Sequence, residues 1–332
     1  MWRDVLIGTY TWGDAEGIYR GRFDDETGAF ETLELAIAAD SPAFLAARGD
    51  MLYAVNEQRE GGVSAFRRDH VELDFVNAQP SGGSLPCHLS AGSDWVAVAN
   101  YGSGTVALFP TADDGGLLLM ADSRQHRGKG PNSSRQETAH AHEVHALGST
   151  LVVPDLGTDT IHRYAVESNR LREDGQANLA PGSGPRHVEM HPSLPLLYVL
   201  NELGNTVDAL SWPDLGARQR VNALPGDFSA ASTTAELQIA RDGRWLYASN
   251  RGHDSIVSFA IDSAGRLHSP EWVPTRGEHP RYFCLDPSNN EDWLIVLNQD
   301  SDNVVVYRLT TGRPTDIVCE TAAPTPVCLM FA

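Results

Sequence analysis

A single unit recurs seven times along the chain, and this repeat constrains the fold more than any other feature of the sequence. Each copy contains two short apolar strands joined by a turn that is rich in Gly, Asn or Asp. Val, Ile, Leu and Tyr dominate the strands, as is typical of β-hairpins. Three representative copies are LYAVNEQREGGVSAF (52–66), VAVANYGSGTVALF (96–109) and LYASNRGHDSIVSFAI (246–261).

A further strand precedes each hairpin, usually after a proline. The leading residues of these strands follow one another at intervals of 44 to 55 residues and are Pro42, Pro86, Ala141, Pro185, Ala235, Pro280 and Pro326. A period of this length with four strands per unit is typical of propeller blades. The sequence therefore predicts an all-β, seven-bladed β-propeller of four-stranded antiparallel blades that forms one domain over residues 1–332.

The two ends of the chain complement each other. The first copy lacks its opening strand, whereas the last copy stops after that strand, at 326–332. We therefore expect the C-terminal strand to join the N-terminal blade and to remove an exposed sheet edge. Repeated β-units also build β-sandwiches, but the spacing and the matching ends favour the propeller.

The composition disfavours several classes of partner. The chain has 44 acidic and 25 basic residues, a net charge of −19, whereas nucleic-acid binding depends on a basic surface. No apolar stretch is long enough to span a membrane, and the N-terminus reads as a strand rather than a signal peptide. We expect a cytoplasmic protein without nucleic-acid or membrane partners. Its four cysteines are expected to be buried thiols, not disulfides or zinc ligands: Cys87, Cys284, Cys319 and Cys328.

In a propeller the innermost strand of each blade lines a central channel, so equivalent positions surround it. The position after each leading residue carries Ala43, Cys87, His142, Arg186, Glu236, Arg281 and Val327. A second set follows the position that ends each second strand, which is Asn in five copies and Asp155 in another: Tyr10, Glu57, Tyr101, Leu156, Glu202, Arg251 and Gln299. The Asn residues themselves suit turns. Buried ionisable groups are costly unless paired, so these two sets predict a functional site.

An acidic protein needs a local group of basic side chains to bind an anion. Arginine suits this task because its planar guanidinium grips carboxylate or phosphate with two hydrogen bonds. The candidates are His88, His140, His142, His187, Arg186, Arg251 and Arg281. The basic, Gly- and Ser-rich segment 122–139 is expected to be a long loop, and its Lys129 could add to this group.

Seven motifs run in order from end to end of the chain: GTYT (8–11), LYAVNE (52–57), HAHEV (140–144), PGSGPRHV (181–188), YVLNELGNTV (198–207), YASNRGHDSI (247–256) and HPRYF (279–283). Together these motifs resemble those of the bacterial lactonase family of seven-bladed propellers, which includes 6-phosphogluconolactonases and fungal carboxy-cis,cis-muconate lactonizing enzymes.

The resemblance implies a lactonase that hydrolyses a sugar-acid lactone, with 6-phosphogluconolactone of the pentose phosphate pathway as the expected substrate, and needs no metal or cofactor. It implies that Arg186 polarises the carbonyl and that Glu202 or a histidine, His140 or His142, activates water. The remaining candidates would bind the substrate: Glu57, His88, Tyr101, Lys129, Asp155, His187, Glu236, Arg251 and Arg281.

Three alternatives stay open at this stage. The same groups could serve a carboxymuconate lactonizing enzyme. A propeller could also be a protein-interaction platform, since fold alone does not determine function. A divalent ion could bind the oxygens of Glu57, Asp155, Asn201 and Glu202, although the arginines oppose a cation. The expected partner is a small anionic lactone, bound by a monomer or homodimer.

Overall fold

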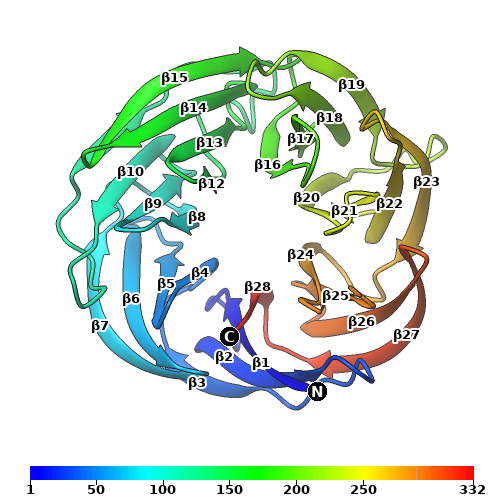
Figure 1. Cartoon of the computed structure of the whole chain (residues 1–332), viewed down its shortest axis with the longest axis horizontal. Helices are drawn as coiled ribbons and strands as arrows, with labels where there is room; N and C mark the ends of the chain where they lie inside the picture. Colours follow the sequence, from blue (N-terminus) through cyan, green and yellow to red (C-terminus); the bar gives the residue numbers. More distant parts are fainter. Residues whose placement is uncertain (289) are drawn as a thin grey trace. The chain divides into compact units, whose positions relative to one another are not determined.

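The computed structural model describes residues 1–288 and 290–332, which form 28 β-strands and, within these ranges, no helix (Figure 1). The strands form seven sheets of four strands each, and in six of them the strands follow their order in the chain. These sheets are the blades of a seven-bladed β-propeller, so the predicted fold class is confirmed. The described residues include no helix that could cross a membrane.

The remaining sheet combines both ends of the chain, as predicted. Its order is β28–β1–β2–β3, with β28 at Pro326–Phe331, β1 at Trp2–Thr9, β2 at Gly17–Asp24 and β3 at Glu34–Ala38. The backbone N–H of Ala332 donates to the carbonyl of Asp4 at 2.9 Å. The C-terminal strand therefore supplies the strand that the N-terminal repeat lacks.

The contacts of the chain group it into two compact units. Unit 1 comprises Met1–Ile7, Tyr19–Glu34 and His187–Ala332, and unit 2 comprises Gly8–Ile18 and Leu35–Arg186. The blades from β4 to β15 belong to unit 2, and the strands from β17 to β27 belong to unit 1. That residues 1–332 form one domain stays a prediction.

Unit 2 contains three complete blades. Their strands are β4 (Leu45–Arg48), β5 (Met51–Asn56), β6 (Gly62–Asp69) and β7 (Glu72–Pro80); β8 (Pro86–Ala91), β9 (Trp95–Asn100), β10 (Thr105–Pro110) and β11 (Asp122–Gln125); and β12 (His145–Leu147), β13 (Thr150–Asp155), β14 (Thr160–Glu167) and β15 (Arg170–Asn178).

The other three blades follow along the chain. Their strands are β16 (Pro185–Met190), β17 (Leu196–Asn201), β18 (Thr206–Ser211) and β19 (Ala217–Asn222); β20 (Thr233–Ile239), β21 (Trp245–Arg251), β22 (Ser255–Ile261) and β23 (Leu267–Pro274); and β24 (Pro280–Leu285), β25 (Trp293–Asn298), β26 (Asn303–Thr310) and β27 (Arg313–Ala322).

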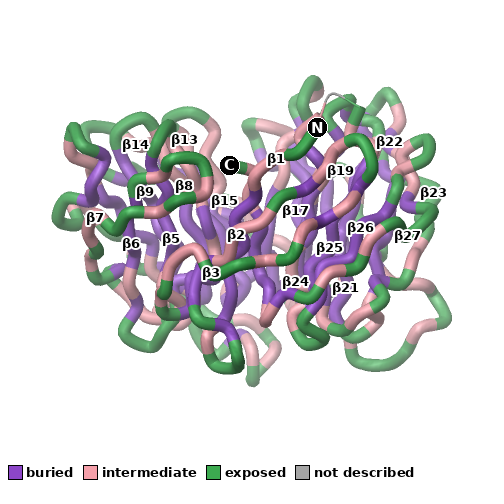
Figure 2. Tube along the Cα trace, turned by 90° about the horizontal axis from the view of Figure 1, so that it is seen from below, coloured by how far each residue is buried: buried purple, intermediate pink, exposed green. Residues whose placement is uncertain are grey.

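Burial changes from strand to strand within a blade. Second strands such as β17 and β25 are buried along their whole length, whereas fourth strands such as β7 are mostly exposed or half-buried (Figure 2). The apolar strands predicted from the repeat are therefore the ones buried on both faces. They pack on neighbouring blades, as in unit 1, where Trp293, Val304 and Phe23 belong to one core cluster.

Tyrosines on second strands connect a blade to the next one. The hydroxyl of Tyr198 donates to the carbonyl of Gly265 at 2.7 Å, and Tyr53 and Tyr247 make the same bond to Gly115 and Gly312, each at 2.8 Å. All three glycines have positive φ, between 78° and 85°, a conformation that glycine adopts without strain. Each glycine thus turns a carbonyl toward the tyrosine of the preceding blade.

The Asn residues that end the second strands are structural, as turn chemistry predicts. Four of their side-chain amides donate to carbonyls of the segment that enters the same blade, whereas that of Asn201 donates to Thr206 and Asp208. The four bonds to carbonyls are Asn56 to Asp40 (2.9 Å), Asn100 to Ser81 (3.1 Å), Asn250 to Ala223 (3.0 Å) and Asn298 to Thr275 (3.1 Å). These four amides therefore fix where their blades begin.

Three local expectations need correction. The segment 122–139 is not loop throughout, because its first four residues pair with β10 as the outer strand β11. The strand expected from Ala141 begins only at His145, since His140–Val144 makes just one bridge, Ala141 to Asp155. Cys319 is half-buried because it lies on the outer strand β27, whereas the other three thiols are buried.

Candidate functional site

Three of the positions predicted to face the channel lie at irregularities of the first strand. The pairing register shifts at Cys87 on β8, at Glu236 on β20 and at Arg281 on β24. A bulge of this kind re-aims a side chain and is common beside active sites. The repeat therefore presents ionisable side chains at positions where the regular ladder is interrupted.

In unit 2, Tyr101 organises the two candidate histidines. Its ring stacks on that of His140, with 4.5 Å between centroids, and meets His142 edge-on at 5.4 Å. Its hydroxyl accepts hydrogen bonds from Arg135 at 3.2 and 3.3 Å. A residue of the basic loop thus contacts the aromatic side chain that packs on both histidines.

The hydrogen bonds of His140 define its orientation. Nδ1 lies 2.8 Å from the carbonyl oxygen of Tyr101, and a carbonyl only accepts, so Nδ1 carries a proton. Nε2 lies 3.2 Å from Oε1 of Glu137, whose side chain is largely exposed. His140 therefore has one ring nitrogen hydrogen-bonded to a backbone carbonyl and the other beside a surface carboxylate. This arrangement is suited to proton transfer.

His142 and His88 have different surroundings. The Cys87 thiol donates to the backbone carbonyl of His142 at 3.0 Å. The His88 ring packs on Phe44 at 3.8 Å, and its Nε2 lies 3.8 Å from Glu143. Glu143 also contacts His145 at 3.2 Å. The sequence analysis did not name Glu143 as a candidate, although it belongs to the motif HAHEV. The only signal for it is its contact with His88 and His145.

Two more predicted residues of unit 2 are engaged in hydrogen bonds. Glu57 accepts a hydrogen bond from the hydroxyl of Tyr10 at 2.7 Å. Asp155 accepts from His126 at 2.7 Å and from the backbone N–H groups of His140 and Thr158 at 2.9 and 3.0 Å. Burial alone would raise the pKa of Asp155, but these hydrogen bonds, led by that of His126, outweigh it and lower the pKa.

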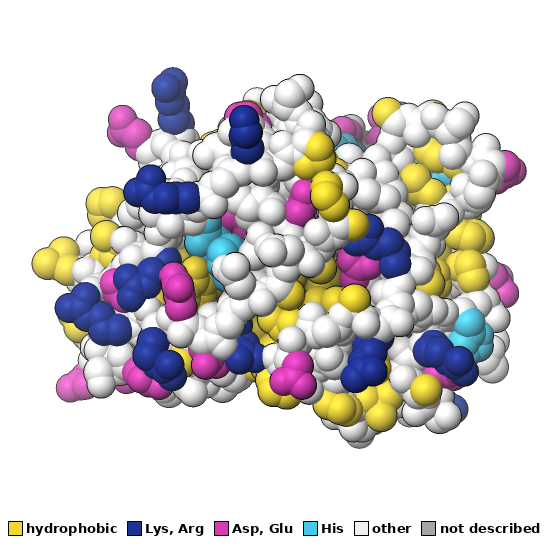
Figure 3. All heavy atoms as spheres, turned by 90° about the horizontal axis from the view of Figure 1, so that it is seen from above, with side chains coloured by type: hydrophobic (Ala, Val, Ile, Leu, Met, Phe, Trp, Pro, Cys, Tyr) yellow, Lys and Arg dark blue, Asp and Glu magenta, His cyan; other side chains and the backbone are white. Residues whose placement is uncertain are grey.

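The last two predicted residues of unit 2 differ in exposure. Arg186 is buried on β16, whereas Lys129 is exposed in the loop that follows β11. On the face drawn in Figure 3, Lys and Arg side chains lie next to Asp and Glu side chains rather than in one basic patch. Lys129 is thus exposed to solvent, unlike Arg186.

In unit 1, Glu202 and Arg251 form a buried ion pair. Oε2 of Glu202 lies 2.9 Å from the Arg251 guanidinium, and the two side chains are only 2% and 8% exposed. Arg251 also donates to the backbone carbonyl of Thr234 at 2.7 Å. The residue directly after β17 and the last residue of β21 are therefore joined across neighbouring blades by charge and hydrogen bonding.

His279 lies against this pair and was not singled out from the sequence. Its Nε2 lies 3.5 Å from Arg251. Burial, and then the charge of Arg251, lower the pKa of His279 to about 4, with a smaller contribution from Arg281 and opposition from Asp300 and Asp254. His279 is thus neutral at pH 7. Its positive φ of 60° directly before a leading proline recurs at Ser41, Leu85, Gly184 and Thr325, but the sequence does not reveal that conformation.

The other predicted acid and histidine of unit 1 form a second pair. Nδ1 of His187 lies 3.3 Å from Oε2 of Glu236, and both side chains are buried. The backbone N–H of Glu236 donates to the hydroxyl of Ser249. Sequence reasoning assigned both residues to the substrate but did not foresee that they contact each other.

Comparison with known proteins identifies the family. The family description "Lactonase, 7-bladed beta-propeller" matches residues 4–331. The chain belongs to this lactonase family. The resemblance inferred from the motifs is therefore confirmed, and with it the expectation of an enzyme that hydrolyses lactones.

Individual proteins match over almost the whole chain. The 6-phosphogluconolactonase of Bacillus subtilis is 37% identical, covering 98% of this chain and 97% of its own. A protein from Lactobacillus plantarum of solved structure is 31% identical, with a TM-score of 0.94 and full coverage of both chains. The periplasmic gluconolactonase of Pseudomonas aeruginosa is 27% identical, with a TM-score of 0.93, covering 100% of this chain and 99% of its own.

Proposed function

We propose that this lactonase hydrolyses 6-phosphogluconolactone to 6-phosphogluconate. The observation that carries the proposal is the similarity to the 6-phosphogluconolactonase of Bacillus subtilis, 37% identical over 98% of this chain. The basic residues of the predicted site are consistent with a phosphorylated substrate, because guanidinium groups bind phosphate with two hydrogen bonds.

The proposed chemistry is attack of water on the lactone carbonyl. Arg186 stabilises the oxyanion of the tetrahedral intermediate, and Glu202 takes the proton of the attacking water. The ring C–O bond then breaks, and the leaving oxygen takes up a proton from the conjugate acid. Loss of one oxyanion donor typically lowers kcat about 10²- to 10³-fold, and loss of a general base about 10²- to 10⁴-fold.

His140 and His142 are the alternatives to Glu202 as the base that takes the proton of the attacking water. Of these two histidines we favour His140, because its Nδ1 is held by the Tyr101 carbonyl at 2.8 Å, which fixes the orientation of Nε2. His140→Gln should then lower kcat more than His142→Gln does. Equal activity of His140→Gln and the unchanged enzyme would assign the proton transfer elsewhere.

The direct test is pH-stat hydrolysis of 6-phosphogluconolactone by the unchanged enzyme and by Arg186→Ala and Glu202→Gln. Matched controls come from the blade of Glu202, where Asp208 and Arg220 form an ion pair at 2.6 Å that no part of the proposal uses. We expect Asp208→Asn and Arg220→Ala to keep their activity while the two site variants lose it. A rate no higher than spontaneous hydrolysis for the unchanged enzyme would overturn the assignment of this substrate.

A second substrate is favoured by the solved gluconolactonase that shares this fold at 27% identity. Unphosphorylated glucono-δ-lactone therefore belongs in the same assay. Because Arg281 is proposed to bind phosphate, Arg281→Ala should raise KM for the phosphorylated lactone and leave KM for glucono-δ-lactone unchanged. Higher kcat/KM on the unphosphorylated lactone would make gluconolactone the substrate instead.

A further inference from the structure

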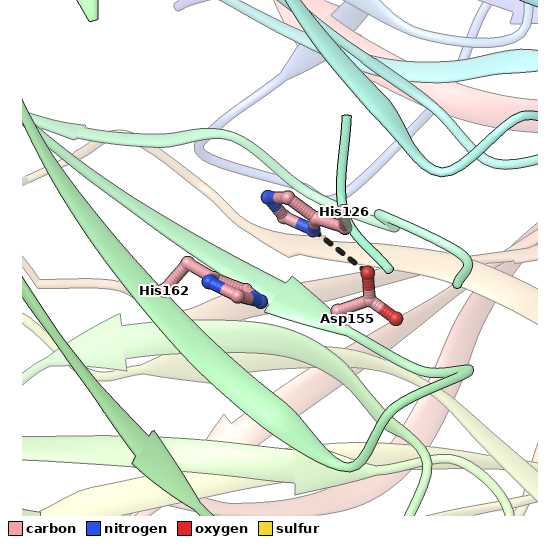
Figure 4. Close-up of side chains that lie close together, drawn as sticks. All are labelled: His126, Asp155 and His162. Carbon is pink, nitrogen blue, oxygen red and sulfur yellow. Dashed lines mark hydrogen bonds and ion pairs between the residues drawn. The ribbon is translucent and has the colours of Figure 1, made fainter. Parts of the chain in front are cut away.

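Three side chains of unit 2 that the proposed chemistry does not use lie close together. His126 follows β11, Asp155 ends β13 and His162 lies on β14. One nitrogen from each histidine and one oxygen of Asp155 lie within 4.8 Å of one another (Figure 4). Two imidazoles and a carboxylate are a common set of protein ligands for zinc and related ions.

His126 is held rigidly between two partners. Its Nδ1 lies 2.7 Å from Oδ2 of Asp155, and its Nε2 lies 2.8 Å from the hydroxyl of Tyr164. The side chains of His126 and Asp155 are 2% and 0% exposed. Since both ring nitrogens of His126 have partners, the ring cannot rotate away, and Nδ1 faces the carboxylate in a fixed position.

His162 completes the set with a neutral ring. It stacks on His126 with 3.8 Å between centroids and an interplanar angle of 29°. Within the described part of the chain, neither ring nitrogen of His162 makes a hydrogen bond. Burial, and then the charge of His126, lower the pKa of His162 to about 4, against the attraction of Asp155. A neutral imidazole offers the lone pair that a metal ion requires.

We propose that His126 Nδ1, Asp155 Oδ2 and a ring nitrogen of His162 bind one divalent transition-metal ion of the zinc type, with water as a fourth ligand. Ligand atoms around tetrahedral zinc lie about 3.4 Å apart, given metal–ligand distances near 2.1 Å. His126 Nδ1 and Asp155 Oδ2, now 2.7 Å apart, must therefore separate by about 0.7 Å, and the nitrogen of His162 must approach from within 4.8 Å. Binding moves the proton of His126 from Nδ1 to Nε2, since a metal-bound nitrogen carries none.

Tyr164 fits the same arrangement as a supporting residue. When the ion holds Nδ1 of His126, the proton of that ring is on Nε2 and is donated to the Tyr164 oxygen. Metal-bound histidines usually donate their second N–H to a neighbouring acceptor, which fixes the ring for the metal. The hydroxyl at 2.8 Å already occupies that acceptor position.

One of the three proposed ligands, His162, lines a cavity between β14 and β15. The cavity has a volume of about 140 Å³ and is lined by His162, Arg163, Tyr164, Glu173, Gly175 and Gln176. His162 is only half-buried, so an ion in this cavity meets its ring first. His126 and Asp155 then lie directly behind that ring.

The ion would support the predicted active site without entering its chemistry. The second oxygen of Asp155 accepts the backbone N–H groups of His140 and Thr158 at 2.9 and 3.0 Å. An ion on Oδ2 would therefore tie the segment after β11 to the carboxylate that holds the backbone of His140. The bound ion acts as a brace for this part of the fold.

The test is Zn²⁺ titration by calorimetry of protein freed of metal with EDTA, supported by Co²⁺ absorption spectra. We expect one ion per chain. His162→Gln should weaken binding at least about 10- to 100-fold, the loss known even for residues that only support a ligand. His268→Gln removes an exposed imidazole elsewhere in the chain and should leave the affinity unchanged.

X-ray absorption spectroscopy of the zinc-loaded unchanged protein makes the test independent of any variant. Two imidazole ligands are expected, and fewer than two would overturn the proposal. Two other results would overturn it as well. One is equal Zn²⁺ affinity of the unchanged protein and of folded His162→Gln. The other is no binding to the unchanged protein at about 100 μM Zn²⁺, a weak-binding limit of roughly 5 kcal/mol.

Discussion

The ion pair between Glu202 and Arg251 allows a test of whether burial or distance determines how much an ion pair contributes to stability. Arg251→Met removes a guanidinium that lies 2.9 Å from the carboxylate and 2.7 Å from the Thr234 carbonyl. It leaves a carboxylate that is only 2% exposed without this partner. Breaking one side of a buried pair costs about 3 to 5 kcal/mol, so the free energy of unfolding should fall by this amount.

The second single variant and the double variant complete the cycle. Glu202→Gln keeps the shape of the side chain and should cost about 3 kcal/mol, because Arg251 retains its backbone acceptor. The double variant carries no unpaired buried charge. It should therefore cost about 3 to 5 kcal/mol rather than the sum of the single losses, which gives a coupling energy near 3 kcal/mol, the upper end for contacting residues.

The comparison pair lies in the blade of Glu202. Asp208 and Arg220 are closer, at 2.6 Å, but Arg220 is 38% exposed. Exposed pairs contribute about 0 to 1 kcal/mol, so Arg220→Met should cost less than Arg251→Met despite the shorter distance. Urea unfolding followed by tryptophan fluorescence measures all of these changes. If the losses of unfolding free energy in Glu202→Gln and Arg251→Met add up to that of the double variant within about 0.5 kcal/mol, the reasoning from burial is wrong.

Three further results are expected. Tyr198→Phe removes the donor to the Gly265 carbonyl at 2.7 Å and should cost about 1 to 3 kcal/mol in urea unfolding; an unchanged midpoint would contradict this role. The pKa of His279 falls to about 4 on folding, chiefly through burial, so its contribution to stability is complete above pH 6.5 and is lost as the pH falls toward 4. The ring is partly exposed, so His279→Gln should reduce the loss of unfolding free energy between pH 7 and pH 4.5 by only about 1 to 2 kcal/mol. Equal losses in the variant and the unchanged protein would refute the pKa shift. Deleting 326–332 should abolish cooperative unfolding, seen by circular dichroism, because β1 loses its partner.

The propeller could be predicted from the sequence because its signals are local. Alternating apolar residues and turn residues specify each hairpin within about twenty positions, and their even spacing specifies the blade. The extra residue on β8, β20 and β24 has no such signal, because a bulge depends on how two strands pair. The outer strand β11 was hidden for the same reason: its four residues, DSRQ, are all polar, and only pairing with β10 makes them a strand.

The candidate site was predictable in residue type but not in contacts. The motifs pointed to His140, Glu202 and Arg251, yet no spacing reveals that the last two form a pair across blades. Asp155 was assigned to the substrate, whereas its carboxylate binds His126, which lies 29 residues away in the chain. Partners so distant in sequence meet only through the packing of folded elements.

The pairing of β28 with β1 has a consequence for biosynthesis. Strands β1, β2 and β3 leave the ribosome early, but β28 follows β3 only after the six other blades have been made. At roughly 5 to 20 residues per second, this interval is on the order of 15 to 60 s. During this interval the unpaired edge of β1 can pair with a wrong strand or with another chain. Chaperones that bind nascent chains at the ribosome should therefore matter more for this protein than for one whose first sheet is completed by strands adjacent in the sequence.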